Sequence, residues 1–292
     1  MSYSVDEGYT WTGLGNSIFS VVGNKAVWNG EVWVAVGEGA VNTLATSIDG
    51  INWTGRGKVF GIRGNNLHYN YNHKMWVAVG EDNIKKRNIA YSTDNGASWS
   101  YPSNEIFSDF GNDVTWIGYK WFAVGKGSTN TFAESDDGIN WTGKGMQFSV
   151  AGYGIASDDY GVVVMCGEDA DSARNIQYTW FDLYNSDVSM IWNNLTSASS
   201  KISNPTSIVC YGYDMWFVLG SGTDQIVYLR DGLSSVGKGA PFSGKATGII
   251  HTGERWIVVG EDTDVNKRMF MLSDTNTIWD IRGAVTTAYW RP

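Results

Sequence analysis

The chain has 292 residues, with 15 Trp, 15 Tyr and 36 Gly but only 4 Pro, and its formal net charge is −9. This composition is typical of a closed all-β fold, because aromatic residues suit half-buried strands and glycine suits the turns between them. The acidic balance, 30 Asp and Glu against 21 Lys and Arg, argues against nucleic acid as a partner, since such a chain repels phosphate backbones.

Targeting and crosslinking signals are missing from the sequence. The opening segment MSYSVDEGYTW has neither the charged region nor the apolar region of a signal peptide, so we expect none. No apolar stretch approaches the roughly 20 residues that a membrane helix requires, so we expect no membrane insertion. Cys166 and Cys210 lie in apolar runs of different repeats, which predicts free thiols rather than a disulfide framework.

A short apolar strand motif recurs along the chain, at residues 32–38, 75–81, 120–126, 162–168, 215–221 and 255–261. All copies but the fourth carry a tryptophan four residues before a glycine, namely Trp33, Trp76, Trp121, Trp216 and Trp256. Apolar residues at successive positions predict strands that neighbouring sheets cover on both faces.

A second motif, called the turn motif below, follows each of these strands and also opens the chain. It runs from Ser through Asp and Gly to Trp, as in STDNGASW at 92–99. Its aspartates are Asp6, Asp49, Asp94, Asp137, Asp187, Asp231 and Asp274, and its tryptophans are Trp11, Trp53, Trp99, Trp141, Trp192 and Trp279. The aspartates recur about every 44 residues, and a fixed period in this range predicts a propeller or a solenoid.

Each repeat contains four predicted strands. In residues 24–57, NKAVW forms the first strand, Asn29-Gly30 a tight turn and EVWVAVG the second strand. TLATS forms the third strand, and NWTGRG follows the turn motif as the fourth. Four antiparallel strands make one blade of a β-propeller, so we expect an all-β fold with residues 1–292 as a single propeller domain.

The two ends of the chain decide the expected number of blades. Residues 1–12 supply a third strand, a turn motif and a fourth strand, whereas residues 284–290 look like a first strand. We therefore expect seven blades of four antiparallel strands, in a ring closed by pairing of the N- and C-terminal strands. The seventh blade lacks an evident second strand, so it could hold three strands, and a six-bladed ring with loose ends is the alternative.

The turn motif resembles the Asp-box, or BNR, repeat of sialidases and other β-propellers. The family pattern is Ser-x-Asp-x-Gly-x-x-Trp, which residues 4–11 and 92–99 match fully. The resemblance implies that the motif is a structural hairpin between the third and fourth strands, in which Ser and Asp bond the turn backbone and Trp fills the hairpin base. The WVAVG and IAYSTDNG strings are also similar to propellers of secreted bacterial proteins and large DNA viruses, which implies a virion or extracellular surface.

Charged residues recur in the loops after the second strands and in the links that leave the fourth strands. We predict that Arg56 approaches residues 81–87, that Lys144 approaches 168–174, and that Lys238 approaches 261–268. These contacts are either rim salt bridges, worth about 0–1 kcal/mol each, or a charged face that binds a partner. The candidate binding residues are Arg56, Lys58, Glu81, Asp82, Arg87, Lys144, Glu168, Asp169, Arg174, Lys238, Glu261, Asp262 and Arg268.

Signals for catalysis are weak. Sialidases need an arginine cluster, a Tyr–Glu nucleophile pair and an acid Asp, and their usual Arg-Ile-Pro motif is absent here. His68, His73 and His251 lack metal-ligand spacing, so we expect them on the surface or in turns and expect no metal. We assign no catalytic residue and no cofactor.

The sequence thus favours a non-enzymatic binding or structural propeller that engages a protein or glycan partner through its charged loop face. Tyrosines near the turns between first and second strands offer rings on which sugars could stack, namely Tyr71, Tyr119, Tyr160 and Tyr213. The alternative is a sialidase-like glycoside hydrolase. The sequence carries no signal for an oligomeric state.

Overall fold

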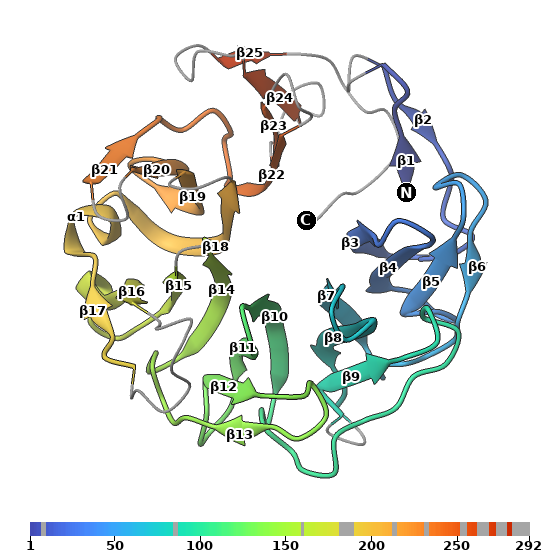
Figure 1. The fold of residues 1–292 in the computed structure, drawn as a ribbon. Helices are drawn as coiled ribbons and strands as arrows, with labels where there is room; N and C mark the ends of the chain where they lie inside the picture. The colour runs from blue at the N-terminus through green and yellow to red at the C-terminus, as the bar shows by residue number, and fades with distance from the viewer. Residues whose placement is uncertain are drawn as a thin grey trace. The chain divides into compact units, whose positions relative to one another are not determined.

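The computed structural model describes residues 1–6, 10–83, 87–158, 161–180, 190–211, 215–230, 234–251, 256–261, 269–272 and 279–281. Of Arg230 and the last two of these segments it describes the backbone alone. The chain divides into two compact units, unit 1 with residues 1–3 and 13–152 and unit 2 with residues 4–12 and 153–292. The described residues are mainly strands, with only the short helices α1 (Thr196–Ser199) and η1 (Ser172–Arg174) (Figure 1).

Unit 1 contains three consecutive repeats of antiparallel strands. Their strands are β3 (Val22–Trp28), β4 (Trp33–Glu38), β5 (Leu44–Ser47) and β6 (Thr54–Gly55), then β7 (Arg63–Asn70), β8 (Met75–Glu81) and β9 (Ile89–Ser92), then β10 (Phe110–Ile117), β11 (Lys120–Lys126), β12 (Phe132–Ser135) and β13 (Thr142–Gly143). In the second repeat a bridge between Tyr91 and Ser100 takes the place of the fourth strand. Single bridges from Glu38 to Arg63 and from Phe110 to Glu81 join the three repeats into one 11-stranded sheet.

Unit 2 contains three four-stranded sheets, each with its strands in chain order. They are β14 (Ala151–Ser157), β15 (Val162–Glu168), β16 (Ile176–Trp180) and β17 (Asn193–Asn194), then β18 (Ile202–Tyr211), β19 (Met215–Gly222), β20 (Ile226–Arg230) and β21 (Ser234–Gly237), then β22 (Ala246–His251), β23 (Trp256–Gly260), β24 (Met269–Leu272) and β25 (Trp279–Ile281). The predicted succession of four antiparallel strands per repeat is therefore confirmed for these sheets.

The chain begins with a two-stranded sheet of β1 (Ser2–Tyr3) and β2 (Thr12–Gly13), which flank the first turn motif. Within unit 2, Trp11 packs against Ile257 and Val259 of β23. No helix among the described residues is long and apolar enough to cross a membrane.

The core of each unit lies between consecutive sheets. In unit 1, Val34 and Val36 of the first repeat pack with Leu67 and Trp76 of the second. The same arrangement continues with Met75 and Val77 of the second repeat against Trp121 and Trp141 of the third. The interior residues of the recurring strand motifs are buried because neighbouring repeats cover both of their faces, as their unbroken apolar sequence predicted, whereas Trp33 and the charged residues at the strand ends are only partly buried.

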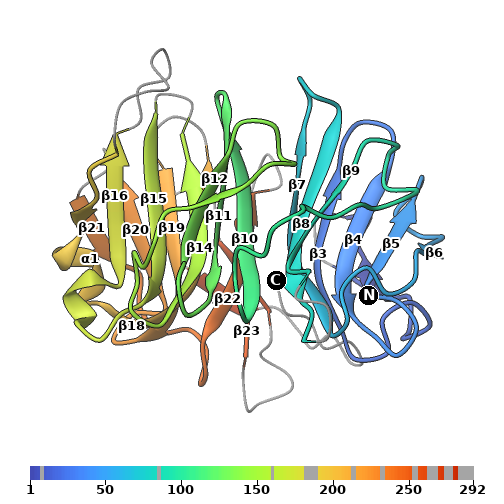
Figure 2. The same ribbon diagram turned by 90° about the horizontal axis from the view of Figure 1, so that it is seen from below.

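A β-bulge at the same position of successive first strands joins one repeat to the next. In β3 the pairing with β4 skips Asn24, and this bulged residue donates from Nδ2 to the Gly64 carbonyl of β7 at 2.7 Å. Asn65 bonds Gly111, Asn112 bonds Gly152, and in unit 2 Thr206 bonds Ala246 in the same way. In both views of unit 1, β7 lies between β3 and β10 (Figures 1 and 2). A bulge turns a side chain out of its own sheet, and here it satisfies a carbonyl of the following repeat.

Glycine is required where the first strand of a repeat packs on the second strand of the preceding repeat. A Cβ added to Gly64 would lie 2.6 Å from Cβ of Val36, and one added to Gly111 would lie 2.8 Å from Cβ of Val79. The close approach of consecutive sheets thus leaves room for hydrogen alone at these positions.

Candidate functional site

The described turn motifs share one pattern of hydrogen bonds. In the motif at 47–53, Ser47 Oγ donates to Asp49 Oδ1 at 2.9 Å, and the Asp49 carboxylate accepts from the backbone N–H groups of Ile51 and Asn52. The indole N–H of the motif tryptophan donates to the glycine carbonyl, at 2.9 Å in this motif, and the glycine has φ 71°. The motifs at 92–99 and 135–141 repeat these contacts. Their carboxylates are therefore engaged within the turn itself.

These hydrogen bonds favour the charged form of the motif aspartates. The Ser98 hydroxyl, together with the Ser98 backbone N–H, lowers the pKa of Asp94 to about 2. Burial opposes this effect at Asp137, but hydrogen bonds led by the Asn140 backbone and side chain bring its pKa to about 2. A carboxylate with such partners stays ionised and does not supply a proton at neutral pH.

The second turn motif also contacts the preceding repeat. A Cβ on Gly96 would lie 3.1 Å from Val34 Cγ2, and the preceding Asn95 donates to Glu31 Oε2 at 3.0 Å. Asn95 also accepts a hydrogen bond from Asn29 Nδ2 at 3.0 Å. This motif therefore links neighbouring repeats, which is a structural role.

Charged and polar residues near the start of a first strand and the end of the second contact each other within one hairpin. Glu81 pairs with Arg63 at 2.9 Å, and these residues lie opposite each other where β7 begins and β8 ends. Other contacts between the start of a first strand and the end of its second strand are Asp109–Lys126 (3.9 Å), Tyr153–Glu168 (2.8 Å) and Lys245–Glu261 (3.6 Å). Neighbours within a hairpin can meet without an additional loop having to be ordered, which favours contacts of this kind. The predicted approaches of Lys144 to 168–174 and of Lys238 to 261–268 stay predictions, and residues 262–268 lie outside the described residues.

The link after the first repeat approaches Asp82 of the 81–87 loop at Gly61, and the described hydrogen bond of Arg56 lies within its own repeat. Arg56 Nε donates to Thr46 Oγ1 of its own repeat at 2.9 Å. Lys58 Nζ donates to the Gly61 carbonyl, and the carboxylate of Asp82 lies against that same glycine. Asp82 is buried, so it is not the exposed rim charge that we expected.

The other predicted binding residues contact side chains of their own repeats. Lys144 pairs with Glu134 at 2.6 Å, Arg174 lies 4.0 Å from Asp169, and Lys238 Nζ lies 5.6 Å from the centre of the Tyr228 ring. Outside the described residues lie the predicted residues Asp187, Asp231, Asp262, Arg268 and Asp274, the segment 284–290, and the tyrosines Tyr160 and Tyr213.

Of the charged residues predicted to bind a partner, Arg87 lines a cavity. Its guanidinium lies over the Tyr101 ring, 4.5 Å from the centre, and donates a hydrogen bond to that side chain. The cavity measures about 310 Å³ and is bounded by residues 87–89 and by the link 101–106. Tyr101 is itself held by a 2.7 Å hydrogen bond to the Val59 carbonyl. An exposed arginine thus lies against a fixed ring beside an open, mainly polar cavity.

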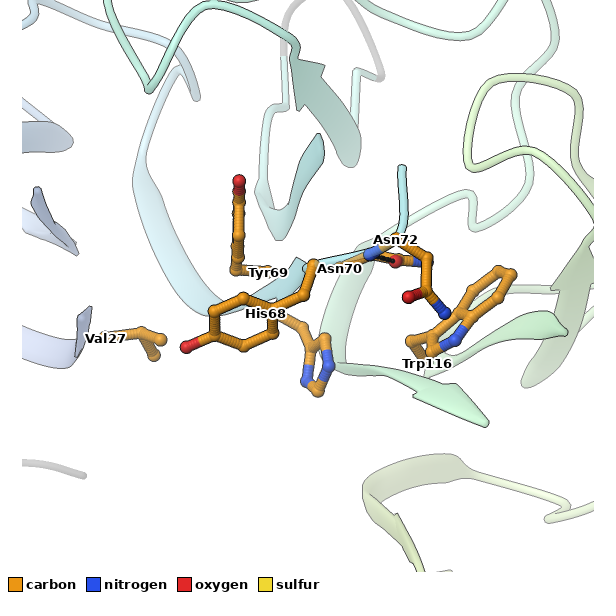
Figure 3. A pocket seen from close by; sticks show the side chains of 7 residues that line it. Val27, His68, Tyr69, Asn70, Asn72 and Trp116 are labelled. Atoms are coloured by element: carbon orange, nitrogen blue, oxygen red, sulfur yellow. Dashed lines mark hydrogen bonds between the residues drawn. The ribbon is translucent and has the colours of Figure 1, made fainter. Parts of the chain in front are cut away.

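A second cavity, of about 270 Å³, lies where the first strands of unit 1 end. Val27 of β3, His68 to Asn70 of β7, the turn residues Tyr71 and Asn72, and Trp116 of β10 line it. Figure 3 shows the labelled side chains of His68, Tyr69 and Trp116 around this space, with Asn72 bonded to Asn70. The lining is aromatic and amide-rich and includes no carboxylate, lysine or arginine.

The histidines differ in part from the prediction that all three lie on the surface or in turns. His73 does lie in the β7–β8 turn, whereas His68 belongs to β7 and packs edge-on against Trp121. Burial, with a smaller effect of Lys25, lowers the pKa of His68 to about 4, so its imidazole is neutral at physiological pH. His251 ends β22 and lies 2.9 Å from the Tyr211 hydroxyl. The described residues include no group of three or more side chains that could hold a metal ion.

Sequence reasoning identified Tyr71 of this cavity but missed His68, Asn70 and Trp116. One usable signal was the strand register. The residue opposite the recurring tryptophan is aromatic in each repeat of unit 1, with Trp28 opposite Trp33, Tyr69 opposite Trp76, and Trp116 opposite Trp121. The signal for Asn70 was the turn asparagine Asn29 of the first repeat, which also follows the aromatic residue and accepts the same two turn N–H groups.

No family model and no curated protein matches this chain. Among solved structures, YCF48 from Cyanidioschyzon merolae is similar with a TM-score of 0.60 and 12% identity, over 93% of this chain and 88% of that one. Also similar is YCF48 bound to a D1 peptide, with a TM-score of 0.55 and 15% identity over 89% of this chain and 81% of that one. A chain of the mitotic checkpoint complex has a TM-score of 0.63 and 11% identity over 92% of this chain and 81% of that one. At these identities the likeness shows the fold alone, which is all-β and of the propeller type.

Proposed function

We propose that this protein is a non-catalytic binding module that recognises a protein partner through the cavity at Arg87. The observation that carries the proposal is the placement of Arg87, which is exposed, stacked on Tyr101, and without an ion-pair partner among the described residues. Arginine and tyrosine are enriched among residues that dominate protein interfaces, and a guanidinium fixed on a ring loses little entropy on binding. A partner segment with a carboxylate would supply the missing counter-charge.

The similar structures support a protein partner. One YCF48 structure holds a D1 peptide, and the other similar chain belongs to the mitotic checkpoint complex. The wider charged loop face remains part of the proposal, because charged rims accelerate association even where single contacts add little affinity. A virion or cell-surface setting stays a prediction from the sequence.

A sialidase-like hydrolase is the alternative function. The Tyr153 hydroxyl donates to Glu168 Oε2 at 2.8 Å in unit 2, a contact in which the carboxylate could act as the base of a tyrosine nucleophile. Burial, reinforced by the Glu168 carboxylate, raises the pKa of Tyr153, so the phenol holds its proton at neutral pH. The glycosidase panel described below decides between the two functions.

The architecture that we propose is a single domain of seven blades with Asp-box turns, closed by its two ends. The six consecutive repeats and the packing of Trp11 on β23 within unit 2 support it. A crystal structure tests it directly. Six blades, or chain ends in separate blades, would contradict the proposal.

The test of function is selection from a phage-displayed library of random peptides against the full chain. We expect enriched peptides to contain Asp or Glu, and their affinity, measured by fluorescence polarisation, to fall at least tenfold with Arg87→Ala, a loss of about 1.4 kcal/mol. Arg87→Lys should weaken binding to an intermediate degree, since it keeps the charge but loses the planar contact with Tyr101. Rising salt should weaken wild-type binding.

Arg56→Ala is the matched control, because it removes an exposed arginine of the same unit that does not line the cavity. Equal binding of the selected peptides by Arg87→Ala and wild type would refute the site, and a library that yields no binding peptide would refute the function. Turnover of a sialoside or glucoside in a glycosidase panel would refute the non-catalytic claim.

A further inference from the structure

We infer that the cavity at the ends of β3, β7 and β10 is a binding site for a neutral sugar ring. This site is separate from the cavity at Arg87 and goes beyond the protein-binding function proposed above. Its volume of about 270 Å³ lies near the lower end of small-ligand sites, about 300 Å³, so it suits one pyranose ring of a glycan.

Aromatic rings form the apolar part of the site. Trp116 is held by edge-on contacts with Trp121 and His73, whose ring centres lie 5.4 Å and 4.8 Å away. Tyr69 lies against Tyr71, with the ring centres 5.0 Å apart. Rings fixed by such packing present flat apolar faces before a ligand arrives, and the C–H face of a pyranose is the complementary surface. Tyr71 is 66% exposed and therefore free to contact a ligand.

An unused hydrogen-bond donor belongs to the same site. Asn70 is 2% exposed, and its Oδ1 accepts from the backbone N–H groups of Asn72 and His73 at 2.8 and 3.1 Å. Its Nδ2 group is buried without a hydrogen-bond partner. A buried donor left unsatisfied is destabilising, and a sugar hydroxyl is an acceptor that would satisfy it.

The orphaned donor of Asn70 differs from others in the core. The indole N–H groups of Trp76, Trp121 and Trp216 are also unpartnered, but they belong to the recurring strand motif and do not line the cavity. Asn29 of the first repeat makes the same turn contacts as Asn70, since its Oδ1 accepts from the backbone N–H groups of Glu31 and Val32, but its Nδ2 donates to Asn95 Oδ1 at 3.0 Å. The turn asparagine is therefore a feature of both repeats, whereas the unpartnered amide belongs to this site.

The lining selects for a neutral ligand. It contains no carboxylate, lysine or arginine, and its His68 is neutral because burial lowers the pKa to about 4. A phosphate or an acidic sugar would lose its hydration here without gaining a counter-ion. A hexose loses only hydroxyl hydration, which the amides of Asn70 and Asn72 replace.

Saturation-transfer NMR tests the inference, with the full chain and the methyl glycosides of glucose, galactose and mannose at millimolar concentration. We expect transfer from the protein to at least one of them, an at least tenfold loss of affinity with Tyr71→Ala, and retention with Tyr71→Phe, which keeps the ring. Trp180→Ala is the control, because Trp180 is an aromatic of comparable exposure (59% against 66%) far from this lining in sequence. Arg87→Ala should leave sugar binding unchanged, which separates this site from the protein site.

Three results with the sugars alone would overturn the inference. They are no transfer to any of the three glycosides, equal transfer in wild type and Tyr71→Ala, and tighter binding of glucuronic acid than of glucose. Displacement of the sugar by the peptides selected on Arg87 would also overturn it, because it would show one shared site for a protein partner.

Discussion

Replacing Trp141 by alanine should destabilise the protein far more than the same replacement at Trp53. Both side chains fill the same place in their turn motifs and donate to the motif glycine, at 3.0 Å and 2.9 Å. Their surroundings differ, because Trp141 is 3% exposed and packs with Met75 and Val77 of the preceding repeat, whereas Trp53 is half-buried.

The magnitude follows from the buried area. A fully buried tryptophan removes about 200 Å² from water, and about 25 cal/mol per Å² gives roughly 5 kcal/mol, in line with the 3–5 kcal/mol typical of Trp→Ala. We therefore expect Trp141→Ala to lower the free energy of unfolding by about 3–5 kcal/mol. For the half-buried Trp53 we expect roughly half of that.

Urea denaturation followed by far-UV circular dichroism measures both values. Trp141→Phe is the control, since it keeps a ring in the cavity and should recover part of the loss. Equal losses at the two positions, or a loss below about 1.5 kcal/mol for Trp141→Ala, would show that packing between repeats does not set the stability of the motif. A variant with unchanged stability that lost peptide or sugar binding would show instead that the turn motif is a ligand site.

The remaining predictions concern the bulge residue Asn24 and the dependence of stability on pH. Asn24→Ala should lower the free energy of unfolding by about 1–3 kcal/mol, because it leaves the buried Gly64 carbonyl without its 2.7 Å donor. The control Asn193→Ala, at an exposed asparagine, should change it little. A loss below about 0.5 kcal/mol for Asn24→Ala in urea denaturation would contradict the role of the bulge. His68 has a pKa of about 4 in the folded chain against 6.5 when unfolded, so the unfolded chain takes up this proton first as the pH falls. Stability should therefore be complete above pH 6.5 and decline towards pH 4, by up to roughly 3 kcal/mol, and melting temperatures of His68→Gln should lack this decline. The aspartates of the turn motif affect stability at lower pH. Asp94 and Asp137, with pKa values of about 2, should stabilise the fold fully above pH 4 and lose this contribution to stability as the pH falls through 2.

The sequence by itself determined the features that depend on neighbours along the chain. The recurring apolar strands were found where predicted, because burial on both faces demands unbroken apolar residues. Strand pairing within a repeat also followed, since short turns such as Asn29-Gly30 bring consecutive strands together. The turn of Ser47, Asp49 and Gly50 closes within a few residues, so its side-chain pattern specifies it.

Only the tertiary structure decided which side chains meet across repeats. Copies of one motif have the same local pattern but different neighbours, so Trp141 is buried and Trp53 is not. Arg56 bonds Thr46 of its own sheet, a partner that the charge pattern of the loops did not indicate. The bond from Asn24 to Gly64 spans 40 residues and depends on a bulge that alternation of residue types does not reveal. The aromatic cavity forms for the same reason, since three strand ends from different repeats are brought together by the packing of sheets and not by any signal within one strand.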